Sequence, residues 1–234
     1  MKFNDIMKIN LPDEFPDKQF SYFMESSKLV LLPNKDNSWK EFAGASNIIG
    51  WRFRSCYEDM NSYIQSWAGH GANVSFEELY VRERVLFGMF SSGVSCIEST
   101  CYAAYALASH HSIYNLPFGE NEQRRCNPKS LKVALKPFDT AKIVVDELNS
   151  IIQSNEWKFW VSLRNRMTHR SNIPRIIRGA IGGSPPPAKA LQFAATSSTP
   201  AFEADEDYLV NLFEWLAQSI KNLLAGGVEI ATNP

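Results

Sequence analysis

Residues 75–110, SFEELYVRERVLFGMFSSGVSCIESTCYAAYALASH, decide the fold class of this chain. Ser75 and Glu78 have the spacing of a capping box, in which two side chains satisfy free backbone N–H groups where a helix begins. The apolar residues that follow recur at intervals of three, four and seven, which keeps one face of a helix apolar over many turns. They are Leu79, Leu86, Phe90, Ile97, Cys101, Ala104 and Leu107. The stretch therefore predicts a helix to about His110.

Two glycines interrupt this predicted helix. Gly88 and Gly93 each weaken a helix by roughly 1 kcal/mol relative to alanine. We therefore expect another helix to approach closely at these positions.

The same signals of a helix, a capping-box spacing and an apolar stripe, recur elsewhere in the chain. Ser38 and Glu41 form a second capping-box spacing, which predicts a helix to about Gly69. Its apolar positions are Phe42, Ile49, Phe53, Cys56, Met60, Tyr63 and Trp67. Further helices are expected over about 138–154, from 155 to before Pro174, and from the acidic run 203–207 to a stop at Gly226-Gly227. Five helices predict an all-α fold, an antiparallel up-and-down bundle of four to five helices with long loops.

The remaining segments carry weak periodicity. Residues 1–37 are expected to be an irregular N-terminal segment packed on the bundle, with one short strand at Lys28–Leu32. Residues 38–227 form the expected helical domain, and 228–234 a tail. Within the domain, 112–137 and 171–203 are expected loops. Loops as long as the second one are usually functional or mobile.

Composition narrows the class of protein. The 234 residues are 44% hydrophobic, enough to build a core without a metal or a disulfide. A formal net charge of -1 argues against a globally basic nucleic-acid binder but leaves room for a local basic patch. The four cysteines lack the spacing of metal ligands and are expected to be thiols. With no signal pattern and no membrane-spanning apolar run, we expect a cytoplasmic protein without membrane contact.

The candidate chemistry lies in the stretch RNRMTH, residues 164–169. On a helix Asn165 and His169 are four apart and share a face, so the amide can orient the imidazole. Arg164 and His169 are five apart, roughly 140° around the axis. Those two side chains would converge only at a kinked or fraying helix end, or across a symmetric dimer.

This Arg-Asn-x-x-x-His motif, late in a series of helices, resembles the HEPN (higher eukaryotes and prokaryotes nucleotide-binding) domain family. The resemblance implies a metal-independent ribonuclease that acts as a homodimer without a cofactor, as a toxin or defence effector with an antitoxin protein as a partner. It implies that the RNA 2′-hydroxyl attacks the adjacent phosphate. His169 would be the general acid/base, Arg164 would hold the phosphate, and Asn165 would orient either group. Inactive family members make a nucleotide-binding, RNA-binding or protein-interaction module the alternative.

Charge segregation supports an anionic ligand independently. Residues 157–202 contain seven Lys and Arg and no Asp or Glu, which suits RNA or nucleotide phosphate. The candidate substrate-binding residues are Arg166, Arg170, Arg175 and Arg178.

Glu98 is a candidate second-sphere residue, because it lies on a helix strip with Ser91, Ser95, Tyr102 and Tyr105 and could orient Arg164. A purely structural ion pair is the simpler interpretation of Glu98, and Glu83 is also taken as structural.

Ordinary structural roles compete with these assignments. Arg and His near a helix C-terminus also stabilise the negative end of its dipole, so the motif could be only a helix end. Neighbouring His110 and His111 face different directions and are not expected to share a metal. The loop at Gly182-Gly183 lacks the Lys-Ser/Thr of a phosphate-binding loop.

Overall fold

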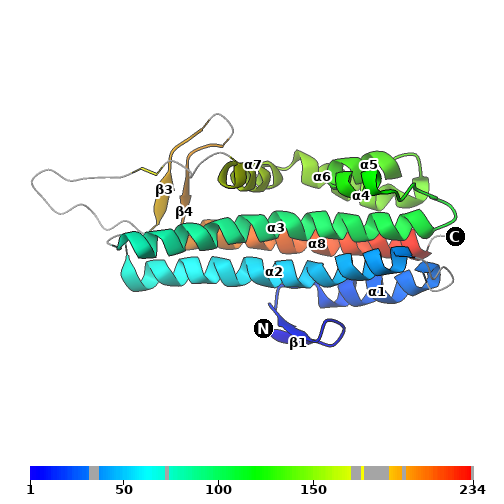
Figure 1. The fold of residues 1–234 in the computed structure, drawn as a ribbon, viewed down its shortest axis with the longest axis horizontal. Helices are drawn as coiled ribbons and strands as arrows, with labels where there is room; N and C mark the ends of the chain where they lie inside the picture. Colours follow the sequence, from blue (N-terminus) through cyan, green and yellow to red (C-terminus); the bar gives the residue numbers. More distant parts are fainter. Residues whose placement is uncertain (32–36, 72–73, 170–174, 177–189, 197–198, 233–234) are drawn as a thin grey trace, which may run out of the picture.

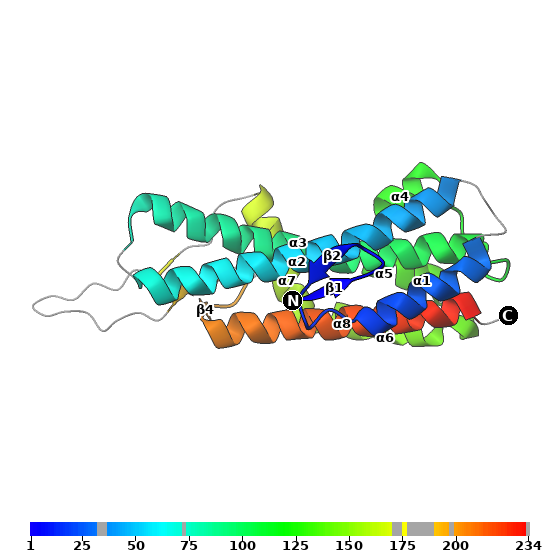
Figure 2. The ribbon, with the colours of Figure 1, turned by 90° about the horizontal axis from the view of Figure 1, so that it is seen from below.

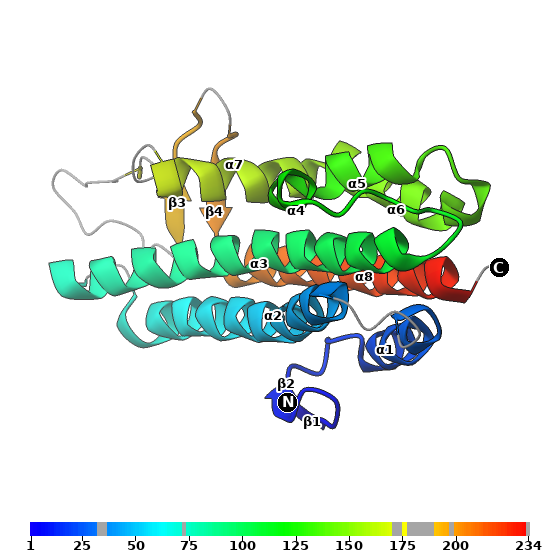
Figure 3. The same ribbon diagram turned by 45° about the vertical axis from the view of Figure 1, so that its right-hand side comes forward.

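The computed structural model describes residues 1–31, 37–71, 74–169, 175–176, 190–196 and 199–232, and the chain is mostly helical within them. Eight α-helices are described, so the expected all-α class is confirmed while the predicted number of five is wrong. Figures 1 and 3 show α3 and α8 in the middle, α1 and α2 on one side, and α4 to α7 on the other.

The two longest helices form an antiparallel hairpin, as Figure 1 shows. Helix α2 spans Asn37–His70 and α3 spans Phe76–His110, close to the predicted bounds. The backbone N–H of Glu78 donates to Ser75 Oγ at 3.2 Å, and that of Ser75 donates to Glu78 Oε2 at 2.9 Å, which confirms this capping box. The side chain of Ser38, expected to cap α2, lies outside the described residues. In the described part of the chain, no helix has the length and apolarity to cross a membrane.

Helix α7 (Asn155–His169), which carries the motif, packs against α3 through Trp160. Trp160 is 1% exposed, and its ring lies 5.0 Å from that of Phe90 between centroids. A Cβ atom at Gly93 would overlap the indole of Trp160. The close approach expected at Gly93 is therefore confirmed, and it sets how near α7 lies to α3. At Gly88 the close neighbour is Asp59 of α2.

Helix α8 (Glu206–Thr232) continues through Gly226 and Gly227, so the predicted stop at this pair is wrong. A Cβ at Gly226 would lie 2.6 Å from Val144 Cγ2, and one at Gly227 would lie 2.5 Å from Phe23 Cε2. These glycines allow close packing with α6 and α1 instead of capping a helix. The described part of the predicted tail, 228–232, belongs to the same helix.

The N-terminal segment is more regular than expected. Strands β1 (Lys2–Asn4) and β2 (Ile9–Leu11) form an antiparallel hairpin, which Figure 2 shows beside α2. Helix α1 (Asp17–Leu31) includes most of the stretch predicted as a strand at Lys28–Leu32. That prediction is wrong because Phe20, Phe23 and Leu31 form the buried stripe of an amphipathic helix that packs on α8.

The predicted loop at 112–137 contains two short helices, α4 (Glu120–Arg125) and α5 (Pro128–Leu135). A 3-10 turn η1 (Asp139–Ala141) then leads into α6 (Lys142–Gln153). Within the predicted loop at 171–203, β3 (Leu191–Phe193) pairs with β4 (Phe202–Ala204) in antiparallel register. These elements are short and expose much of their surface, so they lack the long periodicity that marks α2 and α3.

The cysteines agree with the expectation of thiols. Cys56, Cys96 and Cys101 are buried and Cys126 is half-buried, and all four are free. Burial raises the pKa of Cys126 to about 12, so this thiol stays protonated at neutral pH.

Candidate nucleic-acid interface

A groove of about 520 Å³ with mainly apolar walls lies between α5, α6 and α7, beside Glu98 of α3. Figure 3 shows α5, α6 and α7 along one side of α3. The charged and amide lining of the groove comes from Arg164, Asn165 and Lys158 of α7, Lys129 of α5 with its cap Asn127, and Glu98 of α3. Three cations against one carboxylate make this groove suited to an anionic ligand.

Glu98 contacts the motif arginine directly. Arg164 Nη2 donates to Glu98 Oε1 at 3.3 Å, and the two side chains are 28% and 33% exposed. The hydrogen bond holds one edge of the guanidinium against α3. Arg164 Nε is buried and has no hydrogen-bond partner among the described residues. The contact agrees with the hypothesis that Glu98 orients Arg164.

Burial raises the pKa of Glu98, and the positive charge of Arg164 opposes this shift only in part. A carboxyl group whose pKa is higher in the folded than in the unfolded protein stabilises the fold while it is protonated. This contribution is therefore present in full below the pKa of the unfolded state. That stability is lost as the pH rises through the folded pKa. The ionised carboxylate is thus tolerated in the fold instead of stabilising it.

Glu98→Gln is therefore expected to gain stability relative to the wild type as the pH rises from about 4 to about 7, since glutamine has no charge to desolvate. Urea unfolding of both proteins across this pH range measures the difference. Glu120→Gln, at a side chain that is 84% exposed, controls for the change in net charge. A difference between wild type and Glu98→Gln that does not vary with pH would contradict the role given to burial.

His169 lies beyond the end of the groove. It is exposed, and α7 is α-helical through this residue, so Arg164 and His169 point roughly 140° apart. His169 is four residues after Asn165 and seven after Ser162, both of which line the groove, so it continues their face of α7. The rise from Arg164 to His169 along the axis is about 7.5 Å.

Among the described residues, none of the other arginines predicted to bind substrate lines the groove. Arg166 lies on α7 but does not line it. Arg175, which lies outside the helices, forms an ion pair with Glu83, with 3.2 Å between Nε and Oε1. Arg170 and Arg178 lie outside the described residues.

Lys129 was not predicted as a site residue, because its segment was expected to be a loop. The available signal was Asn127-Pro128-x-Ser130, an N-cap with proline at the first helical position. Asn127 Oδ1 accepts the N–H groups of Lys129 and Ser130 at 2.9 and 3.0 Å. Since those amides are occupied, α5 offers the groove its positive end and the Lys129 ammonium, not free N–H groups.

Comparisons with protein-family models, with curated protein sequences and with solved structures find no match for this chain. The similarity of residues 164–169 to the HEPN motif therefore remains a resemblance. The function of the groove has to be inferred from the chemistry of its residues.

Proposed function

We propose that this protein is a HEPN-like, metal-independent endoribonuclease whose site is the groove between α5 and α7. The observation that carries the proposal is the placement of Arg164 and Asn165, two residues of the motif, in a groove with Lys129 and Lys158. An up-and-down bundle of helices would carry this site, as in the family that the motif resembles. The enzyme would serve as a toxin or defence effector, restrained by an antitoxin protein.

Four of the groove residues would bind RNA. Arg164, which is hydrogen-bonded to Glu98, would bind the scissile phosphate and stabilise the charge that develops on it. Lys129 and Lys158 would bind neighbouring phosphates along the strand. Trp157, which also lines the groove, offers a ring on which an unpaired base can stack.

His169 would transfer protons in the cleavage step. A base takes the proton of the RNA 2′-hydroxyl as its oxygen bonds to the adjacent phosphorus. The bond from phosphorus to the 5′-oxygen breaks, and an acid returns a proton to that leaving oxygen. The products are a 2′,3′-cyclic phosphate end and a 5′-hydroxyl end, and the proposed step uses no metal ion.

A two-fold dimer would bring the two catalytic groups together. Because Arg164 and His169 diverge on one helix, His169 of one protomer would face the groove of its partner. Each composite site would then hold the phosphate with one chain and transfer protons with the other.

The proposal is tested with purified wild-type protein, single-stranded RNA and excess chelator. We expect cleavage that leaves 2′,3′-cyclic phosphate ends, together with a dimer in sedimentation analysis. An RNA of the same sequence with 2′-O-methyl groups should resist cleavage, because it lacks the attacking hydroxyl. RNA that stays intact at high protein concentration would reject the enzyme hypothesis.

The second candidate is an RNA- or nucleotide-binding module without turnover. The observation that favours it is that His169 does not itself line the groove. This function predicts RNA affinity that falls steeply with salt, without cleavage. The cleavage assay therefore separates the two functions on the same protein sample.

A further inference from the structure

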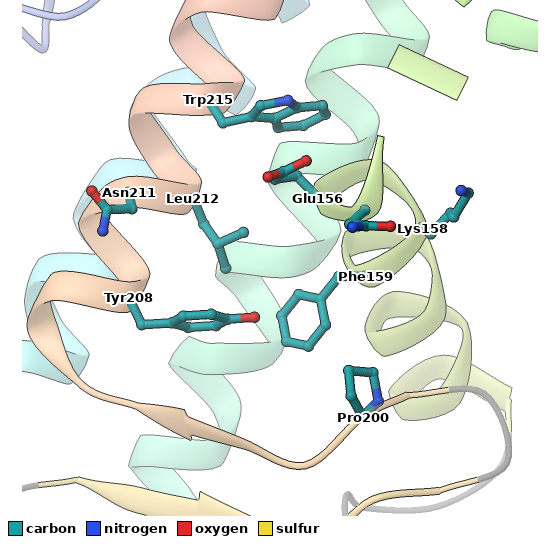
Figure 4. A pocket seen from close by; sticks show the side chains of 9 residues that line it. Glu156, Lys158, Phe159, Pro200, Tyr208, Asn211, Leu212 and Trp215 are labelled. Atoms are coloured by element: carbon teal, nitrogen blue, oxygen red, sulfur yellow. The ribbon is translucent and has the colours of Figure 1, made fainter. Parts of the chain in front are cut away.

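A second pocket, of about 760 Å³, lies between the first turns of α7 and the N-terminal half of α8. Figure 4 shows Trp215 and Tyr208 of α8 and Phe159 of α7 around it, with Leu212 between them. The rings of Phe159 and Tyr208 meet edge to face, with centroids 5.5 Å apart. Three aromatic rings from two helices thus surround an open space of a size typical of ligand pockets.

One carboxylate enters this aromatic pocket. Two charged residues of α7 line the pocket, Glu156 and Lys158. Glu156 extends toward Trp215, whereas Lys158 points away from the α8 side chains (Figure 4), and its Nζ donates to Gln153 O at 2.7 Å. Within the described part of the chain, Glu156 makes no hydrogen bond and no ion pair. Burial, with Glu156 adding to it, raises the pKa of Tyr208 to about 12, so the neighbouring hydroxyl is neutral at physiological pH. The pocket therefore offers a negative charge beside an indole ring.

The surroundings are acidic as well. Residues 203–214 contain five Asp and Glu and no Lys or Arg. Their charge is opposite to that of residues 157–202, which supply Arg164 to the groove and Lys158 to the edge of both pockets. Charge complementarity therefore favours a cationic ligand in this pocket and disfavours a phosphate.

A planar cation suits this geometry best. A guanidinium can stack its face on an indole while its edge donates two hydrogen bonds to a carboxylate. The chain uses the first of these contacts in its own core: Arg82 Cζ lies 4.2 Å from the centroid of a Trp67 ring. Arg82 is 1% exposed and donates from Nε and Nη2 to Ser66, both at 2.8 Å.

We propose that the pocket between α7 and α8 binds the guanidinium group of an arginine side chain from a partner polypeptide, stacked on Trp215 and paired with Glu156. The site goes beyond the proposed ribonuclease function, because it shares only Lys158 with the groove and requires no RNA. A basic segment of the partner protein would therefore lie beside the acidic N-terminal end of α8.

The probe is the peptide acetyl-Gly-Arg-Gly-amide, whose binding is followed by NMR titration of the folded protein. Its citrulline analogue keeps the shape but has no charge, and its lysine analogue keeps the charge but is not planar. Both analogues are expected to bind at least roughly tenfold more weakly than the arginine peptide. Affinity for the arginine peptide should also fall as salt is raised.

Variants connect this binding to the pocket. Glu156→Gln and Trp215→Ala should each weaken the arginine peptide roughly tenfold, and Trp215→Phe should weaken it less because phenylalanine keeps an aromatic face. Trp51→Ala, at an exposed tryptophan of α2, is the matched control and should bind like the wild type. Equal binding of the citrulline or lysine peptide would overturn the proposal. So would unchanged affinity in Glu156→Gln, which keeps the size of the side chain and removes only its charge.

Discussion

His169→Ala is expected to lower the rate of RNA cleavage by roughly 10²- to 10⁴-fold, the range typical of removing a general acid or base. Arg164→Ala should lower it by roughly 10²- to 10³-fold, because the phosphate loses the donor that stabilises its developing charge. Arg164→Lys should recover only part of this loss, since an ammonium cannot form the bidentate contact. Single-turnover cleavage of a labelled oligonucleotide measures all three effects.

The control for these variants is His111→Ala, which removes another histidine next to the C-terminal end of a helix, far along the chain from the motif. It should cleave RNA like the wild type. The wild-type rate should depend on pH near neutrality, and His169→Ala should lose that dependence. If His169→Ala and Arg164→Ala unfold normally and still cleave at the wild-type rate, the site assignment is wrong.

Trp160→Ala is expected to reduce the free energy of unfolding by about 3–5 kcal/mol, the range for removing a large buried aromatic side chain. Its indole fills the space that Gly93 leaves on α3 and contacts Phe90, so truncation opens a cavity between α3 and α7. Trp160→Phe should cost less, because it refills part of the cavity. It also removes an indole N–H that is buried without a hydrogen-bond partner among the described residues.

Chemical denaturation monitored by circular dichroism measures these losses. Trp51→Ala, at a side chain of α2 that is 57% exposed, should change stability by less than about 0.5 kcal/mol. A loss below about 1 kcal/mol in Trp160→Ala would mean that α7 is held to α3 by other contacts. Gly93→Val should destabilise by about 1–3 kcal/mol through overpacking of the same contact.

The long helices could be predicted from sequence because their burial repeats over many turns. Phe53 and Cys56 of α2, and Phe90 and Ile97 of α3, are all fully buried or nearly so, as their spacing indicates. The sequence wrongly predicts a helix stop at Gly226, because a glycine that accommodates a neighbouring helix looks the same in sequence as one that ends a helix. Only the packing of α8 against Val144 distinguishes the two.

The site could be predicted only where its residues lie on the long helices. The pairing of Arg164 with Glu98 was anticipated, since Glu98 is a charged residue on a polar strip of α3. Lys129 was not, because its place beside Arg164 results from how α5 folds back over α3, and no local pattern encodes that distance. The pocket at Trp215 likewise exists only where two helices meet.

The packing of α1 against α8 has a consequence for synthesis of the chain. Phe23 is made early but contacts Gly227, which is near the C-terminal end of the last helix. While the chain leaves the ribosome, α2 and α3 can pair as soon as both have emerged, because their contacts are close in sequence. Phe23 can already contact Phe42 of α2, but the part of the α1 stripe that packs on α8 stays uncovered until α8 is made. Nascent chains truncated before α8 should therefore bind chaperones.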